Sequence, residues 1–256
     1  MTSDAEPLNG RIALVTGATR GIGRATARAL AARGAQVIAV GRTQGALEEL
    51  DDAIRAEDGL PPTLVPMDLV AAEGIDQLGF EIFERHRRLD ILVHSAGILG
   101  GLRPVAHMPP EHWERLMAVN LTAAYRLIRS LDPLLRASQT GRAVFVTCEH
   151  ARQALPFWGA YAATKAGMEA MTRAWADEVD GSPLRILLVD PGATRTALRH
   201  QAFPGEDKAA LADPQEIGVW IADLIASPAD PGLPTEIHRP PERRRRARSG
   251  AAFSPV

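Results

Sequence analysis

The sequence predicts a single-domain α/β fold, a doubly wound parallel sheet with helices on both faces. Short runs rich in valine, isoleucine and leucine alternate with longer helical patterns along most of the chain. These runs are apolar throughout, which is typical of strands buried on both faces of a parallel sheet. Strands that alternate with helices form right-handed βαβ units, which build such a sheet. A length of 256 residues suits one domain of this kind.

Strands and helices are expected in strict alternation as far as residue 227. The predicted strands are 11–16, 36–41, 63–67, 90–94, 142–148 and 185–190. The predicted helices are about 22–33, 45–57, 74–87, 111–136, 158–180 and 214–227. Residues 233–238 form at most a short further strand. We assign residues 1–238 to one domain, and residues 239–256, with the arginine-rich run 243–248, to a basic, mobile C-terminal tail.

Composition and charge argue against several classes of function. A net charge of −2 gives no reason to expect binding of nucleic acid or of a membrane surface. No apolar run approaches the length of a membrane span, and the polar residues 1–9 do not resemble a signal peptide. The single cysteine, Cys148, leaves no intrachain disulfide and predicts a cytoplasmic protein. The seven histidines lack metal-ligand spacing, so no metal site is expected.

A glycine-rich turn joins the first predicted strand to the first predicted helix. It reads Thr-Gly-Ala-Thr-Arg-Gly-Ile-Gly over residues 16–23. Gly17 can adopt the backbone angles of a tight turn, Gly21 leaves room for a diphosphate, and Gly23 lets the helix lie close to the strand. Free N–H groups at the start of the helix then face the anion. The context predicts a dinucleotide site, and the alternative is a glycine-rich turn without a ligand.

Two arginines favour NADP(H) over NAD(H) as the dinucleotide. In a nucleotide-binding βαβ unit, the end of the second strand lies beside the adenosine ribose. Gly41 and Arg42 occupy that place, without the carboxylate that would bind two ribose hydroxyls. Arg42 and Arg20 can instead pair with a 2′-phosphate, unless Arg42 is only a solvated loop residue. Asp68, at the end of the third strand, can accept from the adenine amino group or cap the next segment.

Tyr161 and Lys165 are a candidate acid–base pair. Their i, i+4 spacing places both on one face of the helix predicted for 158–180. A free phenol has a pKa of about 10, and a nearby ammonium is expected to lower it by stabilising the phenolate. Tyr161 can then protonate a carbonyl oxygen as hydride arrives at its carbon. A surface pair without catalytic function is the alternative. Asn120, within an apolar helix face, needs partners from a water chain or the backbone.

Taken in order, these motifs resemble those of the single-domain short-chain dehydrogenase/reductase family. The glycine turn looks like the cofactor turn of that family. Ser-Ala-Gly at 95–97 resembles the end of its Asn-Asn-Ala-Gly segment. Asp-Pro-Gly-Ala-Thr-Arg-Thr at 190–196 resembles its Asn-Pro-Gly-x-x-x-Thr segment beside the nicotinamide. The resemblance covers about residues 9–227 and implies a Rossmann-like fold.

The resemblance also implies an activity and a set of site residues. The protein would be an NADP(H)-dependent oxidoreductase that reduces a ketone, aldehyde or 3-oxoacyl thioester to an alcohol, or catalyses the reverse oxidation. The catalytic positions would include Asn120, Tyr161 as acid/base, and Lys165. The cofactor-binding positions would be Gly17, Thr19, Arg20, Ile22, Gly23, Arg42, Asp68, Leu69, Ser95, Ala96, Gly97, Tyr161, Lys165, Pro191, Gly192 and Thr194.

By the same resemblance, the helices at about 111–136 and 158–180 would form the interface of a homodimer or homotetramer. Lys165 would hold the nicotinamide ribose, and Asn120 would anchor a water that links Lys165 to solvent. The segment 192–213 would close the substrate cleft, with Phe203 near its tip.

Position 148 departs from the family pattern. The catalytic serine of the family stands thirteen residues before the tyrosine, and this chain has Cys148 there, preceded by Thr147. Adjacent strand residues point to opposite faces, so Thr147 cannot take over without a change of register. A thiol is a weaker hydrogen-bond partner than a hydroxyl. Cys148 is therefore the fourth catalytic candidate, and it also supports an alternative function, that of a non-catalytic NADP(H)-binding regulatory protein.

Overall fold

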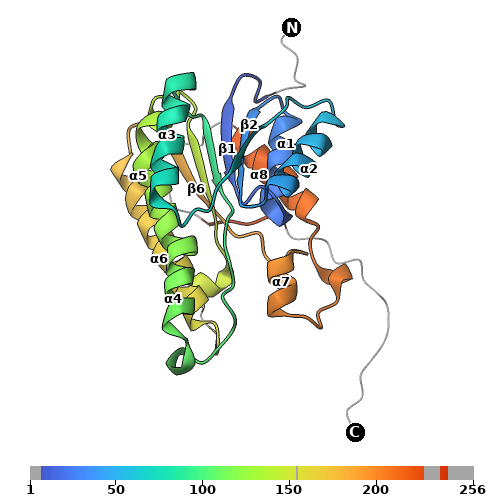
Figure 1. The fold of residues 1–256 in the computed structure, drawn as a ribbon, viewed down its shortest axis with the longest axis vertical. Helices are drawn as coiled ribbons and strands as arrows, with labels where there is room; N and C mark the ends of the chain where they lie inside the picture. The colour runs from blue at the N-terminus through green and yellow to red at the C-terminus, as the bar shows by residue number, and fades with distance from the viewer. Residues whose placement is uncertain (1–6, 154, 228–236, 242–256) are drawn as a thin grey trace.

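A parallel β-sheet of seven strands forms the centre of the molecule, and helices cover both of its faces (Figure 1). The structure is a computed structural model that describes residues 7–153, 155–227 and 237–241. The strand order is β3-β2-β1-β4-β5-β6-β7, and all neighbouring strands run parallel. This arrangement confirms the predicted doubly wound α/β fold.

The elements alternate along the chain as the sequence predicts. The strands are β1 (Ile12–Thr16), β2 (Gln36–Gly41), β3 (Thr63–Pro66), β4 (Ile91–His94), β5 (Arg142–Val146), β6 (Arg185–Val189) and β7 (Ile237–His238). The α-helices are α1 (Gly21–Ala31), α2 (Gln44–Arg55), α3 (Ala72–His86), α4 (Pro110–Met117), α5 (Ala123–Arg136), α6 (Gly159–Glu178), α7 (Ala197–Ala202) and α8 (Pro214–Ala226). Short helical turns are η1 (Val105–His107), η2 (Ala118–Thr122), η3 (Glu149–Ala151) and η4 (Lys208–Ala210).

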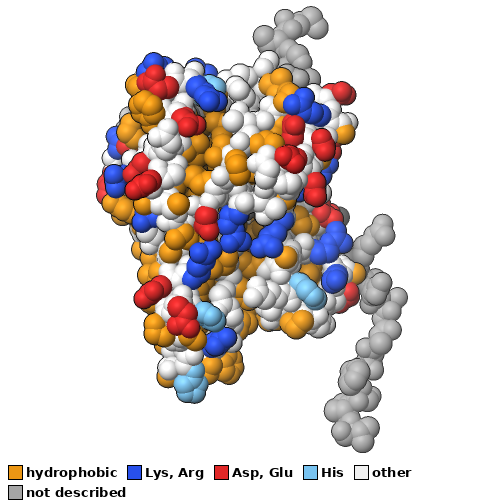
Figure 2. All heavy atoms as spheres, in the orientation of Figure 1, with side chains coloured by type: hydrophobic (Ala, Val, Ile, Leu, Met, Phe, Trp, Pro, Cys, Tyr) orange, Lys and Arg blue, Asp and Glu red, His pale blue; other side chains and the backbone are white. Residues whose placement is uncertain are grey.

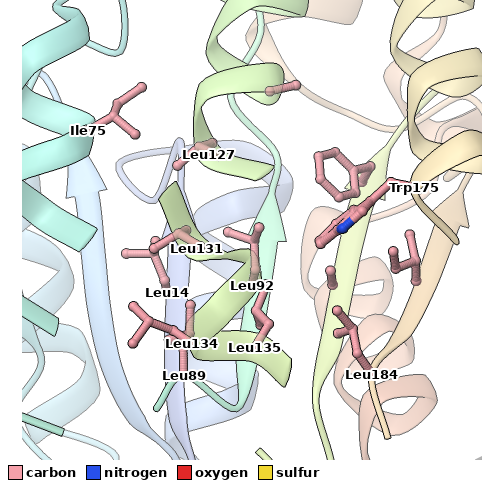
Figure 3. Packing of buried hydrophobic residues seen from close by; sticks show 14 of the residues in the cluster. Leu14, Ile75, Leu89, Leu92, Leu127, Leu131, Leu134, Leu135, Trp175 and Leu184 are labelled. Atoms are coloured by element: carbon pink, nitrogen blue, oxygen red, sulfur yellow. The ribbon is translucent and has the colours of Figure 1, made fainter. Parts of the chain in front are cut away.

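The central strand β1 is buried on both faces because its side chains alternate between two apolar layers. Ile12 and Leu14 belong to a layer that is completed by α3, α5 and α6. Ala13 and Val15 belong to the opposite layer, which α1, α2 and α8 complete. Figure 3 shows Leu14 and Leu131 in the first layer. Each buried leucine contributes about 1.5–3 kcal/mol, so the two layers hold the sheet rigidly behind the site.

The order of strands reverses beside β1. β2 and β3 lie on one side of β1, whereas β4 to β7 lie on the other. In a doubly wound sheet such a reversal leaves a crevice at the carboxyl ends of the strands. The glycine turn follows β1 and the segment 95–97 follows β4, so both reach this crevice.

Three features of the fold differ from the prediction. The helix expected over 111–136 is interrupted by η2, a π-helical turn around Asn120, and such turns within α-helices are frequent at functional sites. The strand expected over 142–148 ends at Val146, because the chain turns into η3 after Cys148. The helix α7, within the segment 192–213, has no counterpart among the predicted helices.

The C-terminal predictions fall partly outside the described residues. The two residues of β7 form the short further strand that was expected. Residues 228–236 and 242–256, which include the arginine-rich run 243–248, lie outside the described part of the chain. The division into a domain at 1–238 and a mobile tail at 239–256 therefore stays a prediction.

Candidate active site

One cleft at the carboxyl ends of the strands collects most of the predicted site residues. Its lining comes from the glycine turn, from the ends of β2 to β6, from α6 and from α7. Of the predicted site residues, the cleft is lined by Gly17, Thr19, Arg20, Ile22, Arg42, Asp68, Leu69, Ser95, Ala96, Gly97, Cys148, Tyr161, Lys165, Pro191, Gly192 and Thr194. Two predicted residues, Gly23 and Asn120, lie behind the cleft and do not line it.

The glycine turn lies so close to neighbouring backbone that side chains are excluded from it. Gly17 has a φ of +69°, and a Cβ there would lie 2.9 Å from the Cα of Ala96. A Cβ on Gly23 would lie 2.3 Å from the carbonyl oxygen of Gly17, so Gly23 allows α1 to approach the end of β1. The first turn of α1 carries no acidic residue, which leaves its N–H groups to attract an anion. These features fit the diphosphate of a dinucleotide.

The end of the cleft beside the glycine turn and β2 is basic. Arg20 and Arg42 are exposed and line the cleft beside the glycine turn and β2. Basic side chains gather on this face between α2 and α7 (Figure 2). Asp68 accepts the backbone N–H of Val70 at 3.1 Å and pairs with Arg115 at 3.2 Å. Asp68 therefore caps the segment that follows β3, and it also lines the cleft, so the structure is compatible with both roles proposed for it.

Tyr161 and Lys165 lie one turn apart on α6, and both side chains are buried at the cleft. The ammonium of Lys165 donates to the carbonyl oxygen of Val146 at 2.9 Å. Burial raises the pKa of Tyr161 well above its usual value of 10, and Cys148 and the charge of Asp190 raise it further. The expectation of a lowered pKa is wrong for this structure, because burial of the hydroxyl outweighs any opposing effect of Lys165, which donates to the end of β5.

Cys148 lines the same cleft as Tyr161 and Lys165, two residues after the end of β5. It lies close enough to Tyr161 to raise the pKa of that hydroxyl. Burial raises the pKa of the Cys148 thiol, an effect that Lys165 and two backbone N–H groups only partly oppose, so the thiol is not activated by Lys165. The hydroxyl of Thr147 instead donates to Glu169 at 2.6 Å. Thr147 therefore cannot replace the missing serine.

Asn120 holds the chain behind the cleft. Its side-chain oxygen accepts the N–H of Ile98, and its nitrogen donates to the carbonyl of Ile98, both at 2.9 Å. The same nitrogen donates to the hydroxyl of Thr164 at 3.1 Å. This amide thus finds its partners in the backbone and in α6, one of the two alternatives open from the sequence. The contacts fasten η2 to the segment that follows β4 and to α6.

The chain matches a known protein family over most of its length. Residues 11–207 match the family model described as short chain dehydrogenase. The chain belongs to the short-chain dehydrogenase family. Among curated relatives, the uncharacterized oxidoreductase YciK of Escherichia coli K12 is 41% identical over 212 residues, which are 82% of this chain and 84% of that protein.

Solved structures of short-chain dehydrogenases superpose on nearly the whole chain. One from Pseudomonas syringae gives a TM-score of 0.87 at 34% identity and covers 93% of this chain and 97% of that one. Another, from Escherichia coli CFT073 in complex with NADPH, gives a TM-score of 0.83 at 39% identity, with coverages of 87% and 93%.

An aromatic wall of this short-chain dehydrogenase was not predicted. Trp158, at the N-terminus of α6, lies 4.0 Å from His150 and 5.9 Å from Tyr161 between ring centroids. Phe203, which follows α7, stacks on Trp158 at 5.6 Å and lies under the guanidinium of Arg199. The predicted closing segment therefore packs over the catalytic helix. Spacing along the chain carries no signal for these contacts, because they join three segments that are distant in sequence.

Within the described ranges, no cluster of histidine, cysteine, aspartate and glutamate has the arrangement of a metal site. No helix in the described part of this short-chain dehydrogenase has the length and apolar character needed to span a membrane.

Proposed function

We propose that this short-chain dehydrogenase reduces a carbonyl compound to an alcohol with NADPH, or catalyses the reverse oxidation. The observation that carries the proposal is the buried hydroxyl of Tyr161 in the same cleft as the glycine turn. NADPH, when bound, supplies the hydride that reaches the carbonyl carbon. The neutral phenol of Tyr161 gives its proton to the carbonyl oxygen, and its high pKa keeps that proton in place until charge develops on the oxygen.

The other residues of the site bind and orient. Thr19, Ile22 and Ser95 line the cleft along the glycine turn and β4, where they would contact the dinucleotide. Lys165, near the carbonyl of Val146, would hold the nicotinamide ribose, and its positive charge favours the phenolate that forms when Tyr161 gives up its proton. Cys148 would help to orient the substrate oxygen beside Tyr161, since both side chains line the same cleft.

NADP(H) is the cofactor that we propose, in preference to NAD(H). Arg20 and Arg42 are exposed at the adenosine end of the cleft, and the described structure gives Arg42 no carboxylate partner. Two guanidinium groups near one phosphate dianion form charge-assisted hydrogen bonds. The similar protein from Escherichia coli CFT073 was solved with NADPH bound, which supports the same choice.

A panel of ketones, aldehydes and 3-oxoacyl thioesters, assayed with NADPH and with NADH, tests the proposal. We expect turnover of at least one class and a preference for NADPH. The alternative of a non-catalytic NADP(H)-binding protein was based on Cys148, and our proposal is supported by the position of Cys148 in the same cleft as Tyr161 and Lys165. Tight binding of NADPH without turnover of any compound would contradict the proposal and favour that alternative.

A further inference from the structure

Two buried carboxylates and one partly exposed arginine form a charged cluster behind the catalytic residues. Arg152 follows η3, and one of its guanidinium nitrogens donates a hydrogen bond to Asp190 at 2.6 Å. Another nitrogen of the same group donates to Glu169. Asp190 and Glu169 are both more than nine-tenths buried. The second oxygen of Asp190 accepts the backbone N–H of Gly192 at 3.2 Å. One arginine thus connects a buried acid on α6 with a buried acid at the end of β6.

This connection joins the two parts of the site that must be held in register. α6 carries Tyr161 and Lys165, and Gly192 lines the cleft on the side where the family resemblance places the nicotinamide. Among the described residues, Arg152 is the one whose side chain bonds both acids. Arg173 bonds only Glu169, at 2.9 Å, and Arg239 approaches Asp190 at 3.6 Å from an exposed position.

Asp190 brings a negative charge to a position where the family pattern has asparagine. That charge raises the pKa of both Tyr161 and Cys148. An unpaired carboxylate in a buried site is costly and acts over a long range, because little water screens it. A guanidinium with two contacts is a suitable counter-ion for two carboxylates. Arg152 has that geometry.

We propose that Arg152 is a positioning residue that neutralises Asp190 and thereby fixes the Gly192 segment against the catalytic helix. Asp190 orders the backbone of the segment through the N–H of Gly192, and Arg152 weakens the effect of its charge on the reacting groups. The inference deepens the proposed function, since the reacting groups are those of the carbonyl reductase site. Its first test, however, needs neither substrate nor cofactor.

The thiol of Cys148 provides that test, because it is the single cysteine of the chain and it lines the cleft. The rate of alkylation by iodoacetamide, measured against pH in the cofactor-free protein, reports the midpoint of thiol ionisation. The groups that act on this thiol are Lys165 and Tyr161 from α6, Asp190 from the end of β6, and the N–H groups of His150 and Ala151 from η3.

Arg152→Gln should move that midpoint to higher pH by about 0.5–1 unit, because the unpaired Asp190 disfavours the thiolate. Arg173→Gln is the matched control, since Arg173 shares Glu169 with Arg152 but does not touch Asp190. We expect it to leave the midpoint unchanged. An Arg152→Gln midpoint equal to that of the wild type would overturn the inference.

The double variant Arg152→Gln/Asp190→Asn separates charge from mere structural support. Removal of both charges should return the midpoint close to the wild-type value, whereas a purely structural loss would persist. If Arg152→Gln does not fold, Asp190→Asn alone decides, and it should lower the midpoint because it removes the negative charge of Asp190 while Arg152 keeps its positive charge. An unchanged midpoint in Asp190→Asn would also overturn the inference.

The pH profile of alcohol oxidation supplies the second readout, because Tyr161 must be ionised to accept the proton. In Arg152→Gln the rising limb should shift to higher pH, and the double variant should restore it. Failure of the wild type to turn over any compound would count against the proposed function and leave the thiol result intact. A normal wild-type activity with an unshifted limb in Arg152→Gln would count against Arg152 alone.

Discussion

At the residue scale, we propose that Cys148 affects how well the site holds the developing charge on a substrate oxygen. Its thiol lines the cleft in the position where the family has a serine. A preorganised hydroxyl donor at such a site contributes about 2.7–4 kcal/mol to barrier lowering, and a thiol, as a weaker donor, supplies only part of this.

Cys148→Ser should therefore raise kcat for a good carbonyl substrate and leave the Kd of NADPH unchanged. Cys148→Ala, which removes the donor, is the comparison and should lower kcat. NADPH should also slow alkylation of Cys148 in the wild type, because the bound nicotinamide would cover the cleft. Equal kcat for the serine variant and the wild type, together with alkylation that NADPH does not slow, would place Cys148 outside the reaction site.

Arg42 is expected to select the cofactor. Arg42→Ala should weaken NADPH binding by about 1.5–3 kcal/mol, the range for a charge-assisted hydrogen bond, and should change NADH binding little. Titration of both cofactors against both proteins measures the difference. Arg55→Ala is a control of like charge, since Arg55 lies on α2 and pairs with Asp51 away from the cleft. Equal losses for NADPH and NADH in Arg42→Ala would contradict a phosphate contact.

At the scale of elements, the site depends on how closely α1 approaches the end of β1. A Cβ on Gly23 would lie 2.3 Å from the carbonyl oxygen of Gly17, so Gly23→Ala forces the two elements apart. We expect the free energy of unfolding to fall by about 1–3 kcal/mol and NADPH binding to weaken.

Gly45→Ala is the matched control for that change. Gly45 also lies near the start of a helix, α2, but a Cβ there meets nothing within 4 Å. This substitution should leave NADPH binding unchanged and should not reduce stability, since alanine lowers the entropy of the unfolded chain. Chemical denaturation and cofactor titration of both variants provide the measurement. An equally small effect at both positions would mean that the close approach is not required.

The sequence predicts the parts of the site that depend on local patterns. The glycine turn, the i, i+4 pair on α6 and the orientation of Cys148 all follow from the spacing of residues on one strand or helix. The direction of the pKa shift of Tyr161 was predicted wrongly, because burial of the side chain raises its pKa. Spacing within α6 contains no information about how deeply the folded chain buries this hydroxyl.

Contacts between distant segments account for the other features that were missed. Trp158, His150 and Phe203 meet only when α7 folds over the catalytic helix. The helix α7 has only six residues, and none of them is buried. So short and exposed a helix leaves no long apolar repeat in the sequence. The π-helical turn at Asn120 arises from side-chain bonds to Ile98, which helix periodicity does not reveal.

At the scale of the whole molecule, the layer of α4, α5 and α6 is the expected interface between subunits. The family resemblance places a homodimer or homotetramer contact on these helices, and Tyr125 of α5 has half of its surface exposed there. Sedimentation at micromolar concentration should therefore show a species larger than the 27.5 kDa chain. Tyr125→Glu should shift the protein toward monomer, whereas Val219→Glu, at an exposed site on α8, should not. A wild type that sediments only as the single chain would contradict this prediction.

The most direct test of the account is the turnover of Tyr161→Phe with its NADPH affinity measured beside it. Loss of the hydroxyl removes the proton donor but keeps the ring, so kcat should fall by about 100- to 10,000-fold while the Kd of NADPH stays the same. Tyr125→Phe is the control, because Tyr125 is the other of the two tyrosines and lies on the surface. A Tyr161→Phe protein that binds NADPH and keeps a kcat near that of the wild type would contradict the proposed mechanism.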